Sequence, residues 1–496
     1  MKKQLMKSSF FRVVEIVIAT AISLLLTPYL IHHLGDANYG LWILILSALG
    51  WFSFIDLGFS DAVQRNIVLA LEKLDNDRIN VVFSVAVILF AVLGGIAALL
   101  VSLLAYFPGL LGVEDSHQSI VTVALSILAI KVFLDFVMSC FHGFYNGYLR
   151  MDIDANLSTL NSIIKAVLVY VLIVDMNIYG AVLATMVADI ITHSLKVYFA
   201  KKLHPSFKFQ FALVSFSEIK HLFAFSKHLI AAGIASTLNR KIDPIIISHI
   251  LGLKYVALYS VINSLINQVE SLVSAFVGVF RPVFIRLTAR NADASNMFKQ
   301  VLSINFFVVL VFYIPLAILA EDFILLWIGP EYATVAPLAY ILAFAYMCKT
   351  VSRPIGSMLM AQAKHKLLAP VYLIGASINI TLSLWLGTLW GIKGIAVATA
   401  CGFFVADVIL HLVLLSRYTN ISVKPPFIRF CLIVMTFIAF TQLGNYILTF
   451  FLPFSWLELF LAAGICLFVV ISFSCPFILE KEIRSKLLKV ILRDNS

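Results

Sequence analysis

Residues 80–107 read NVVFSVAVILFAVLGGIAALLVSLLAYF, a run without a charged side chain. A transmembrane helix needs about 20 apolar residues to cross a hydrocarbon core of about 30 Å. Comparable stretches recur along the whole chain of 496 residues, of which 61% are hydrophobic and 12% charged, with a mean hydropathy of +1.00. A soluble domain is about half apolar and about a quarter charged. The sequence therefore predicts an all-α integral membrane protein.

The apolar stretches predict about fourteen transmembrane helices. Their continuity favours helices over barrel strands, whose apolar positions alternate over about ten residues. The expected spans are 12–33, 40–60, 80–107, 118–142, 157–175, 179–199, 222–250, 255–280, 300–320, 334–358, 368–390, 393–415, 427–450 and 455–477.

Outside the spans, Lys and Arg gather in alternate connections, and the intervening loops hold little beyond Lys254 and Lys393. The positive-inside rule then places both termini in the cytoplasm, which requires an even number of spans. The formal net charge of +10 is accounted for by this topology and by contact with anionic lipid, so no nucleic-acid partner is expected. The six cysteines lack CxxC spacing and the histidines are scattered, so no metal site is expected either.

Two pairs of segments indicate an internal repeat. The stretch from Pro28 to Trp42 resembles that from Pro244 to Tyr259, since each has a proline, a histidine, a turn glycine and a later aromatic residue. GAVLAT at residues 180–185 matches GIAVAT at residues 394–399, and both offsets are about 215 residues. Six spans separate the copies, so the two halves should have the same orientation in the membrane.

This repeat predicts two pseudo-symmetric lobes of six helices. The first is residues 1–200, with spans one to six, and the second is residues 222–415, with spans seven to twelve. A basic cytoplasmic linker, residues 201–221, joins them, and residues 416–496 add two helices and a cytoplasmic tail. Pro28 and Pro244 leave backbone carbonyls unpaired in corresponding helices, which makes these helices candidates for bending or for a static kink.

Polar side chains at helical spacing within five spans indicate a wet interior, because a charge facing hydrocarbon costs at least a few kcal/mol. Cations in such a cavity would attract an anion, and Arg suits bidentate binding of phosphate. The candidate residues for binding a diphosphate or sugar are Arg240, Lys241, Lys131, Lys165, Asn239, Arg65 and Arg281. The candidates for coupling or gating are Glu270, Asp135, Asp243, Asp56, Asp407, Pro28 and Pro244.

Each of these residues also has a structural alternative. Lys131 with Asp135, and Arg240 with Asp243, have the spacing of ion pairs along one helix. Arg65 and Arg281 lie at the expected cytoplasmic ends of their spans, where topology alone accounts for a positive charge.

The stretch LGDANYGLW at residues 34–42, followed by Asp56, Gly58 and Arg65, resembles the opening of the Wzx-type O-unit flippases. This is a polysaccharide transporter branch of the multidrug/oligosaccharidyl-lipid/polysaccharide exporter (MOP) superfamily. The basic mid-chain linker and the Gly180 and Gly394 segments extend the resemblance over almost the whole chain. It implies the fold of the MATE exporters and the lipid II flippase.

The resemblance also implies a function in the bacterial cytoplasmic (inner) membrane. A flippase of this kind moves undecaprenyl-diphosphate-linked oligosaccharide, such as an O-antigen unit for lipopolysaccharide, from the cytoplasmic to the periplasmic leaflet by alternating access. No cofactor is expected, although a proton or sodium gradient could drive transport. Expected partners are membrane lipids and the polymerase and chain-length proteins of a glycan pathway.

Two alternatives remain open from sequence. A multidrug exporter of the same superfamily would offer acidic and aromatic groups to cationic drugs. A membrane glycan ligase or polymerase would normally need a large loop outside the membrane, but no expected loop exceeds about 25 residues and no P-loop, HExxH or serine-nucleophile motif occurs. A transporter, rather than an enzyme, is therefore the favoured interpretation.

Overall fold

The computed structural model describes residues 2–52, 59–206, 208–220, 241–278, 295–362, 364–419, 422–448 and 455–480, with positions 233, 237, 280 and 284. Within these residues every regular element is a helix. Nine helical segments of this part of the chain are long and apolar enough to cross a membrane, and two of them, Phe10–Gly50 and Met151–Leu203, each contain parts of two predicted spans. The predicted all-α membrane fold is confirmed.

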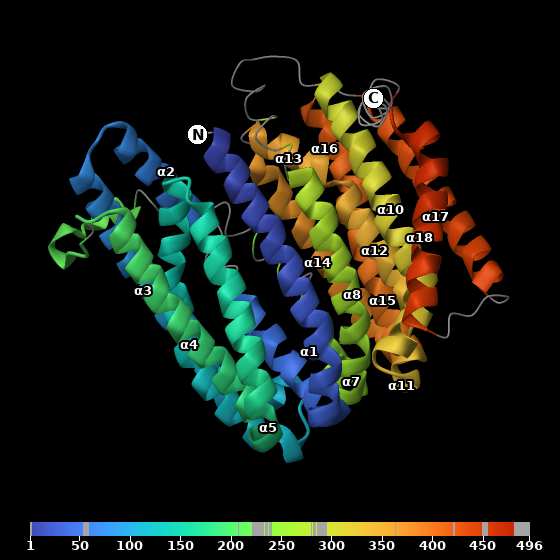
Figure 1. The fold of residues 1–496 in the computed structure, drawn as a ribbon, viewed down its shortest axis with the longest axis horizontal. Coiled ribbons are helices and arrows are strands. Elements are labelled where there is room, and N and C mark those ends of the chain that lie inside the picture. Colours follow the sequence, from blue (N-terminus) through green and yellow to red (C-terminus); the bar gives the residue numbers. More distant parts are fainter. Residues whose placement is uncertain are drawn as a thin grey trace. The chain divides into compact units, whose positions relative to one another are not determined.

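The chain divides into two compact units, Met1–Ala257 and Leu258–Ser496. In the first unit, α3 packs against α4, α4 against α5 and α5 against α1 (Figure 1). Its helices are α1 (Lys2–Gly50), α2 (Phe59–Glu72), α3 (Asn76–Tyr106), α4 (Asp115–Gly147), α5 (Met151–Leu203) and α7 (Asp243–Leu251), with the start of α8 (Leu253–Gly278).

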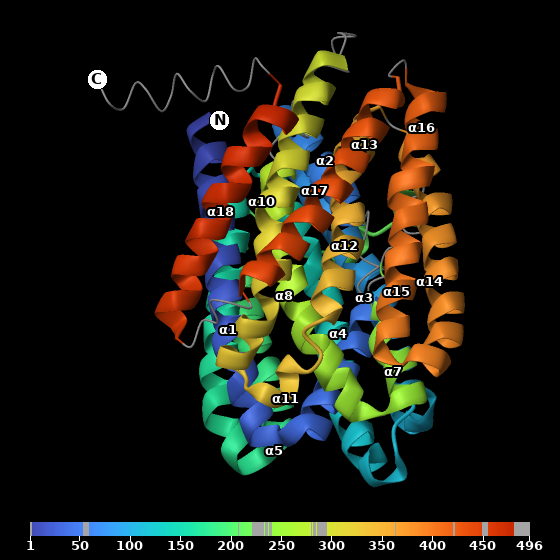
Figure 2. The same ribbon diagram turned by 90° about the vertical axis from the view of Figure 1, so that its right-hand side faces the viewer.

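The second unit contains the rest of α8 and the helices that follow it. Here α10 packs against α12, α17 and α18, and α14 packs against α15 (Figure 2). The helices are α10 (Ser295–Trp327), α11 (Pro330–Ala333), α12 (Leu338–Val351), α13 (Arg353–Ala361), α14 (Leu368–Trp390), α15 (Ile392–Phe403), α16 (His411–Tyr418), α17 (Lys424–Leu448) and α18 (Trp456–Ile478). A π-helical segment, Phe404–Leu410, joins α15 to α16.

The backbone conformation supports the predicted internal repeat. Gly35 and Gly252 both have positive φ, with φ/ψ of 72°/166° and 92°/174°. Asn177 breaks α5 at 49°/−134°, and Gly391 separates α14 from α15 at 60°/−140°. Residues with a Cβ rarely adopt this region of φ. Matched sequence segments therefore contain, or closely follow, chain reversals of the same kind, whereas the division into lobes at residues 201–221 stays a prediction.

Gly180 and Gly394 have the same role in the two copies, three residues after these breaks. A Cβ at Gly180 would lie 2.4 Å from the Leu172 carbonyl oxygen, and one at Gly394 would lie 2.0 Å from that of Leu386. Each glycine therefore lets one helix lie directly against the backbone of the helix before it.

Replacing Gly394 by Ala should destabilise the protein by about 1–3 kcal/mol, because the backbone must move to admit the methyl group. The measurement is thermal unfolding in detergent. The matched control is Gly95→Ala in α3, where an added Cβ meets nothing within 4 Å and Ala is the better helix former. Equal unfolding midpoints for the two variants would contradict this packing.

Three sequence expectations need correction. The segment between the second and third predicted spans is not a loop, because α2 buries Ala62, Val63 and Ile67 and packs against α3 and α4. The predicted span 334–358 consists of two helices, α12 and α13, separated at Ser352. Pro244 lies in the first turn of α7, where its missing N–H leaves no internal hydrogen bond broken, so it begins this helix rather than interrupting it.

Within the first unit, hydrogen bonds join the predicted linker to the first turns of α3. The Asn80 side chain donates to the Ser206 carbonyl oxygen at 3.1 Å and accepts from the Lys208 N–H at 3.0 Å. Arg78 binds both carboxylate oxygens of Glu218, at 2.6 and 2.8 Å. Burial lowers the pKa of His204, at the start of this segment. These contacts order the described part of the linker.

Candidate functional site

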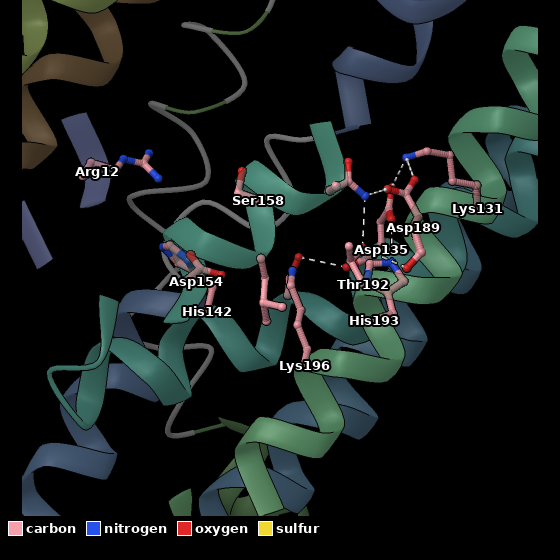
Figure 3. A pocket seen from close by; sticks show the side chains of 13 residues that line it. Arg12, Lys131, Asp135, His142, Asp154, Ser158, Asp189, Thr192, His193 and Lys196 are labelled. Carbon is pink, nitrogen blue, oxygen red and sulfur yellow. Dashed lines mark hydrogen bonds and ion pairs between the residues drawn. The ribbon is translucent and has the colours of Figure 1, made fainter. Parts of the chain in front are cut away.

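A charged cluster lies between α4 and α5 in the first unit. The Lys131 ammonium contacts the carboxylates of Asp135, one turn along α4, and of Asp189 on α5, the latter at 3.0 Å (Figure 3). The exposed fractions of these three side chains are 18%, 37% and 14%. The ion-pair interpretation of Lys131 and Asp135 is therefore confirmed, and a second carboxylate, from α5, joins the pair.

Hydrogen bonds connect this cluster to further polar side chains. The Asn161 amide donates to Asp189 Oδ1 at 2.7 Å and to Thr192 Oγ1 at 3.0 Å, and His193 Nε2 lies 3.0 Å from Asp135 Oδ1. Asn161 and Asp189 both belong to α5, on opposite sides of its break at Asn177. The reversal at Asn177 thus brings the two halves of α5 together so that these side chains meet.

The cluster lines a cavity of about 420 Å³, here called the polar cavity. This volume is within the range of small-molecule sites, about 300–1,000 Å³. Nearly every residue that lines it is polar or charged: Arg12, Lys131, Asp135, Ser139, His142, Asp154, Leu157, Ser158, Asn161, Asp189, Thr192, His193 and Lys196.

A second cavity of about 360 Å³, here called the lysine cavity, shares Lys131, Asp135 and Ser139 with the first. Lys165 of α5 lines it, and no acidic side chain of the described residues lies within ion-pair distance of the Lys165 ammonium. The other walls are mostly apolar: Leu46, Leu49, Gly50, Phe52, Leu128, Val132, Phe136 and Thr185. A cation that is held among apolar side chains without a counter-ion favours the arrival of an anion.

Two further predicted binding residues belong to the described part of the first unit. Lys241 is exposed, and its side chain packs against Gly50, which lines the lysine cavity. Arg65 is exposed on α2. The predicted residues Arg240, Asn239, Arg281 and Asp56 lie outside the described residues.

The predicted gating residues of the first unit also differ in setting. Asp243 is buried in the first turn of α7. Pro28 lies inside α1, seven residues before the break at Gly35.

The second unit has its own charged cluster, of which the sequence analysis predicted only some residues. Glu270 of α8 contacts Lys349 Nζ at 2.8 Å and also Arg353 of α13. Asp407 is buried and accepts a hydrogen bond from the Ser352 hydroxyl at 3.0 Å. Lys349 and Arg353 were not predicted as site residues.

A signal for the missed residues was present in the sequence. Lys349 and Arg353 follow Lys131 and Asp135 by 218 positions (349 minus 131), and Asp407 and His411 follow Asp189 and His193 by the same number (407 minus 189). This spacing is close to that of the repeat. The matched position of Asp135 is a cation, Arg353, and the carboxylate comes from Glu270 instead.

In the first unit, membrane-spanning apolar helices line both charged cavities. Among solved structures, the lipid II flippase MurJ in an inward closed conformation has a TM-score of 0.69 at 15% identity, covering 93% of this chain and 98% of MurJ. A multidrug resistance MATE family transporter of the MOP superfamily has a TM-score of 0.70 at 11% identity, with 84% and 98% covered. At such low sequence identity, the structural similarity to these two proteins establishes a shared fold and no more.

Sequence comparison defines the family. The chain belongs to the polysaccharide biosynthesis protein family, whose profile matches residues 5–288. It is also 24% identical over 419 residues to the membrane protein EpsK of Bacillus subtilis (strain 168), and the match covers 80% of each chain. The predicted membership of a membrane-protein family that acts in polysaccharide biosynthesis is thereby confirmed.

Proposed function

We propose that this chain is a flippase that moves undecaprenyl-diphosphate-linked oligosaccharide units from the cytoplasmic to the periplasmic leaflet of a bacterial inner membrane by alternating access. Family membership supports a role in making polysaccharide, and the fold is shared with a lipid II flippase. The observation that carries the proposal is the Lys165 ammonium, which lacks an acidic partner among the described residues in the lysine cavity.

In this proposal Lys165 is the first contact for the diphosphate. No carboxylate of the described residues lies within ion-pair distance of its ammonium group, whereas two carboxylates contact Lys131 directly. Lys131 therefore contributes to the anion site only if it releases a carboxylate. The remaining residues of the proposed binding set are Lys241, Arg240, Asn239, Arg65 and Arg281.

Coupling and gating are assigned in the same proposal to acidic and helix-breaking residues. Asp135 and Glu270 each pair with cations, so a proton or sodium ion that displaced a pairing would change the local charge. The other proposed residues are Asp243, Asp56, Asp407 and Pro28. Both termini would be cytoplasmic, and a polymerase and chain-length proteins would use the exported units.

The second candidate function is multidrug export. Asp135, Asp154 and Asp189 in the polar cavity favour it, because carboxylates attract cationic drugs. The same cavity is also lined by Arg12, Lys131 and Lys196, which leaves little net negative charge for a drug.

A reconstituted assay separates the two candidates. Protein in vesicles should move a fluorescent lipid-linked oligosaccharide to the opposite leaflet, where an added lectin binds it, and should not accumulate the cationic dye ethidium. Imposed proton and sodium gradients then identify the coupling ion. Dye transport without lectin-accessible glycan would favour the exporter and reject the flippase.

A further inference from the structure

The two adjoining cavities of the first unit differ in chemistry. The lysine cavity has mostly apolar walls and an ammonium group without an acidic partner in the described part of the chain. The polar cavity has three carboxylates, from Asp135, Asp154 and Asp189, and about as many cations. Both cavities reach Lys131, Asp135 and Ser139, so a ligand in one would lie next to a ligand in the other.

An anion is poorly suited to the polar cavity. It would face the three carboxylates, and the cations that line the cavity do not outnumber them. One of these cations, Lys131, already pairs with two of the carboxylates. A sugar hydroxyl both donates and accepts hydrogen bonds, so it needs acceptors and donors side by side. The carboxylates accept, Lys196 and Arg12 donate, and the hydroxyl of Ser158 does both.

Part of the polar cavity is held in place before a ligand arrives. Both hydrogen bonds of the Asn161 amide nitrogen go to protein atoms, Asp189 Oδ1 and Thr192 Oγ1, which fixes the orientation of its carbonyl oxygen as an acceptor. The His142 ring contacts Asp154 at 2.6 Å and also Asn146 at 3.1 Å. A fixed set of polar groups lowers the entropy cost of binding a ligand that matches it.

We propose that the polar cavity is a saccharide-binding subsite, which takes the hydroxyl-rich first residues of a lipid-linked glycan while the diphosphate lies at Lys165. The inference rests on the proposed function and deepens it by assigning each part of the ligand to its own cavity. The order of the two cavities matches the ligand, in which the first sugar is bonded directly to the diphosphate.

Two probes and three variants test this subsite. The probes are undecaprenyl diphosphate and the lipid-linked oligosaccharide extracted from cells that make this protein, and binding of each to purified protein is measured. Ser158→Leu fills the polar cavity while the side chains of the Lys131 network stay unchanged. It should weaken binding of the oligosaccharide lipid about tenfold, as expected for one or two lost hydrogen bonds, and leave that of undecaprenyl diphosphate unchanged.

The other two variants separate this result from the proposed function. Lys165→Ala should weaken binding of both probes. Ser194→Leu, at an exposed position of α5 that lines neither cavity, should change neither and controls for the added leucine. Equal binding of both probes by the unaltered protein, or an equal effect of Ser158→Leu on both, overturns the saccharide subsite. Failure of the unaltered protein to bind either probe instead rejects the flippase.

Discussion

Replacing Lys165 by Ala is expected to reduce export of lipid-linked glycan about ten- to a hundredfold. A hydrogen bond to a charged group contributes about 1.5–3 kcal/mol, and the lysine cavity offers the diphosphate no other cation without an acidic partner among its described lining residues. Export is measured as surface glycan in cells that lack the chromosomal copy and carry the variant gene. Arg240→Ala is expected to act in the same direction.

Three controls test whether a loss of export is due to the missing charge at position 165. Lys165→Arg keeps the charge and should retain most of the export. Lys201→Ala, at the exposed end of α5, removes a lysine outside both cavities and should have no effect. Immunoblotting of membranes must show equal amounts of each variant. Normal surface glycan in the Lys165→Ala, Arg240→Ala double variant would contradict the proposed anion site at Lys165.

Replacing Glu270 by Ala is expected to cost about 3–5 kcal/mol of stability. The substitution removes the carboxylate that contacts both Lys349 and Arg353, and the Glu270 and Lys349 side chains are only 10% and 13% exposed. Two cations would then remain close together in a poorly hydrated setting. Thermal unfolding in detergent measures the loss.

The matched comparison is Glu480→Ala, which removes the carboxylate from the pair between Arg429 and Glu480. That pair is longer, at 3.3 Å, and its side chains are 30% and 25% exposed, so its loss should cost less than about 1 kcal/mol. If Glu270→Ala unfolds at the same temperature as Glu480→Ala, then Glu270 is not a structural anchor. Its proposed role in coupling would gain support if Glu270→Ala nevertheless abolished export.

The membrane fold and its repeat could be predicted from sequence because they depend on simple patterns. Long uncharged stretches define spans, and glycine at positions 35, 180 and 394 marks a chain reversal or a close approach of helices. The helix α2 escaped prediction because it is short and mixes Arg65 with its buried apolar face, so it reads as a polar connection between spans. Its partners, α3 and α4, are visible only in the fold.

The candidate site could be predicted only in part. Lys131, Asp135 and Lys165 were found because each stands out in an apolar span, but spacing along α4 could not show that Asp189, on another span, also binds Lys131. Lys349 and Arg353 were missed although they lie one turn apart inside the predicted span 334–358. Their partner Glu270 belongs to α8, far away in sequence.

The contact between Lys131 and Asp135 also bears on how the protein is made. Both residues are on α4, one turn apart, whereas Asp189 is synthesised more than fifty residues later. During insertion by the translocon, α4 would enter lipid before the second half of α5 had left the ribosome. A lysine without a counter-ion raises the cost of that step, and a carboxylate on the same turn lowers it. Asp135 can therefore assist biogenesis of the nascent chain before any transport begins.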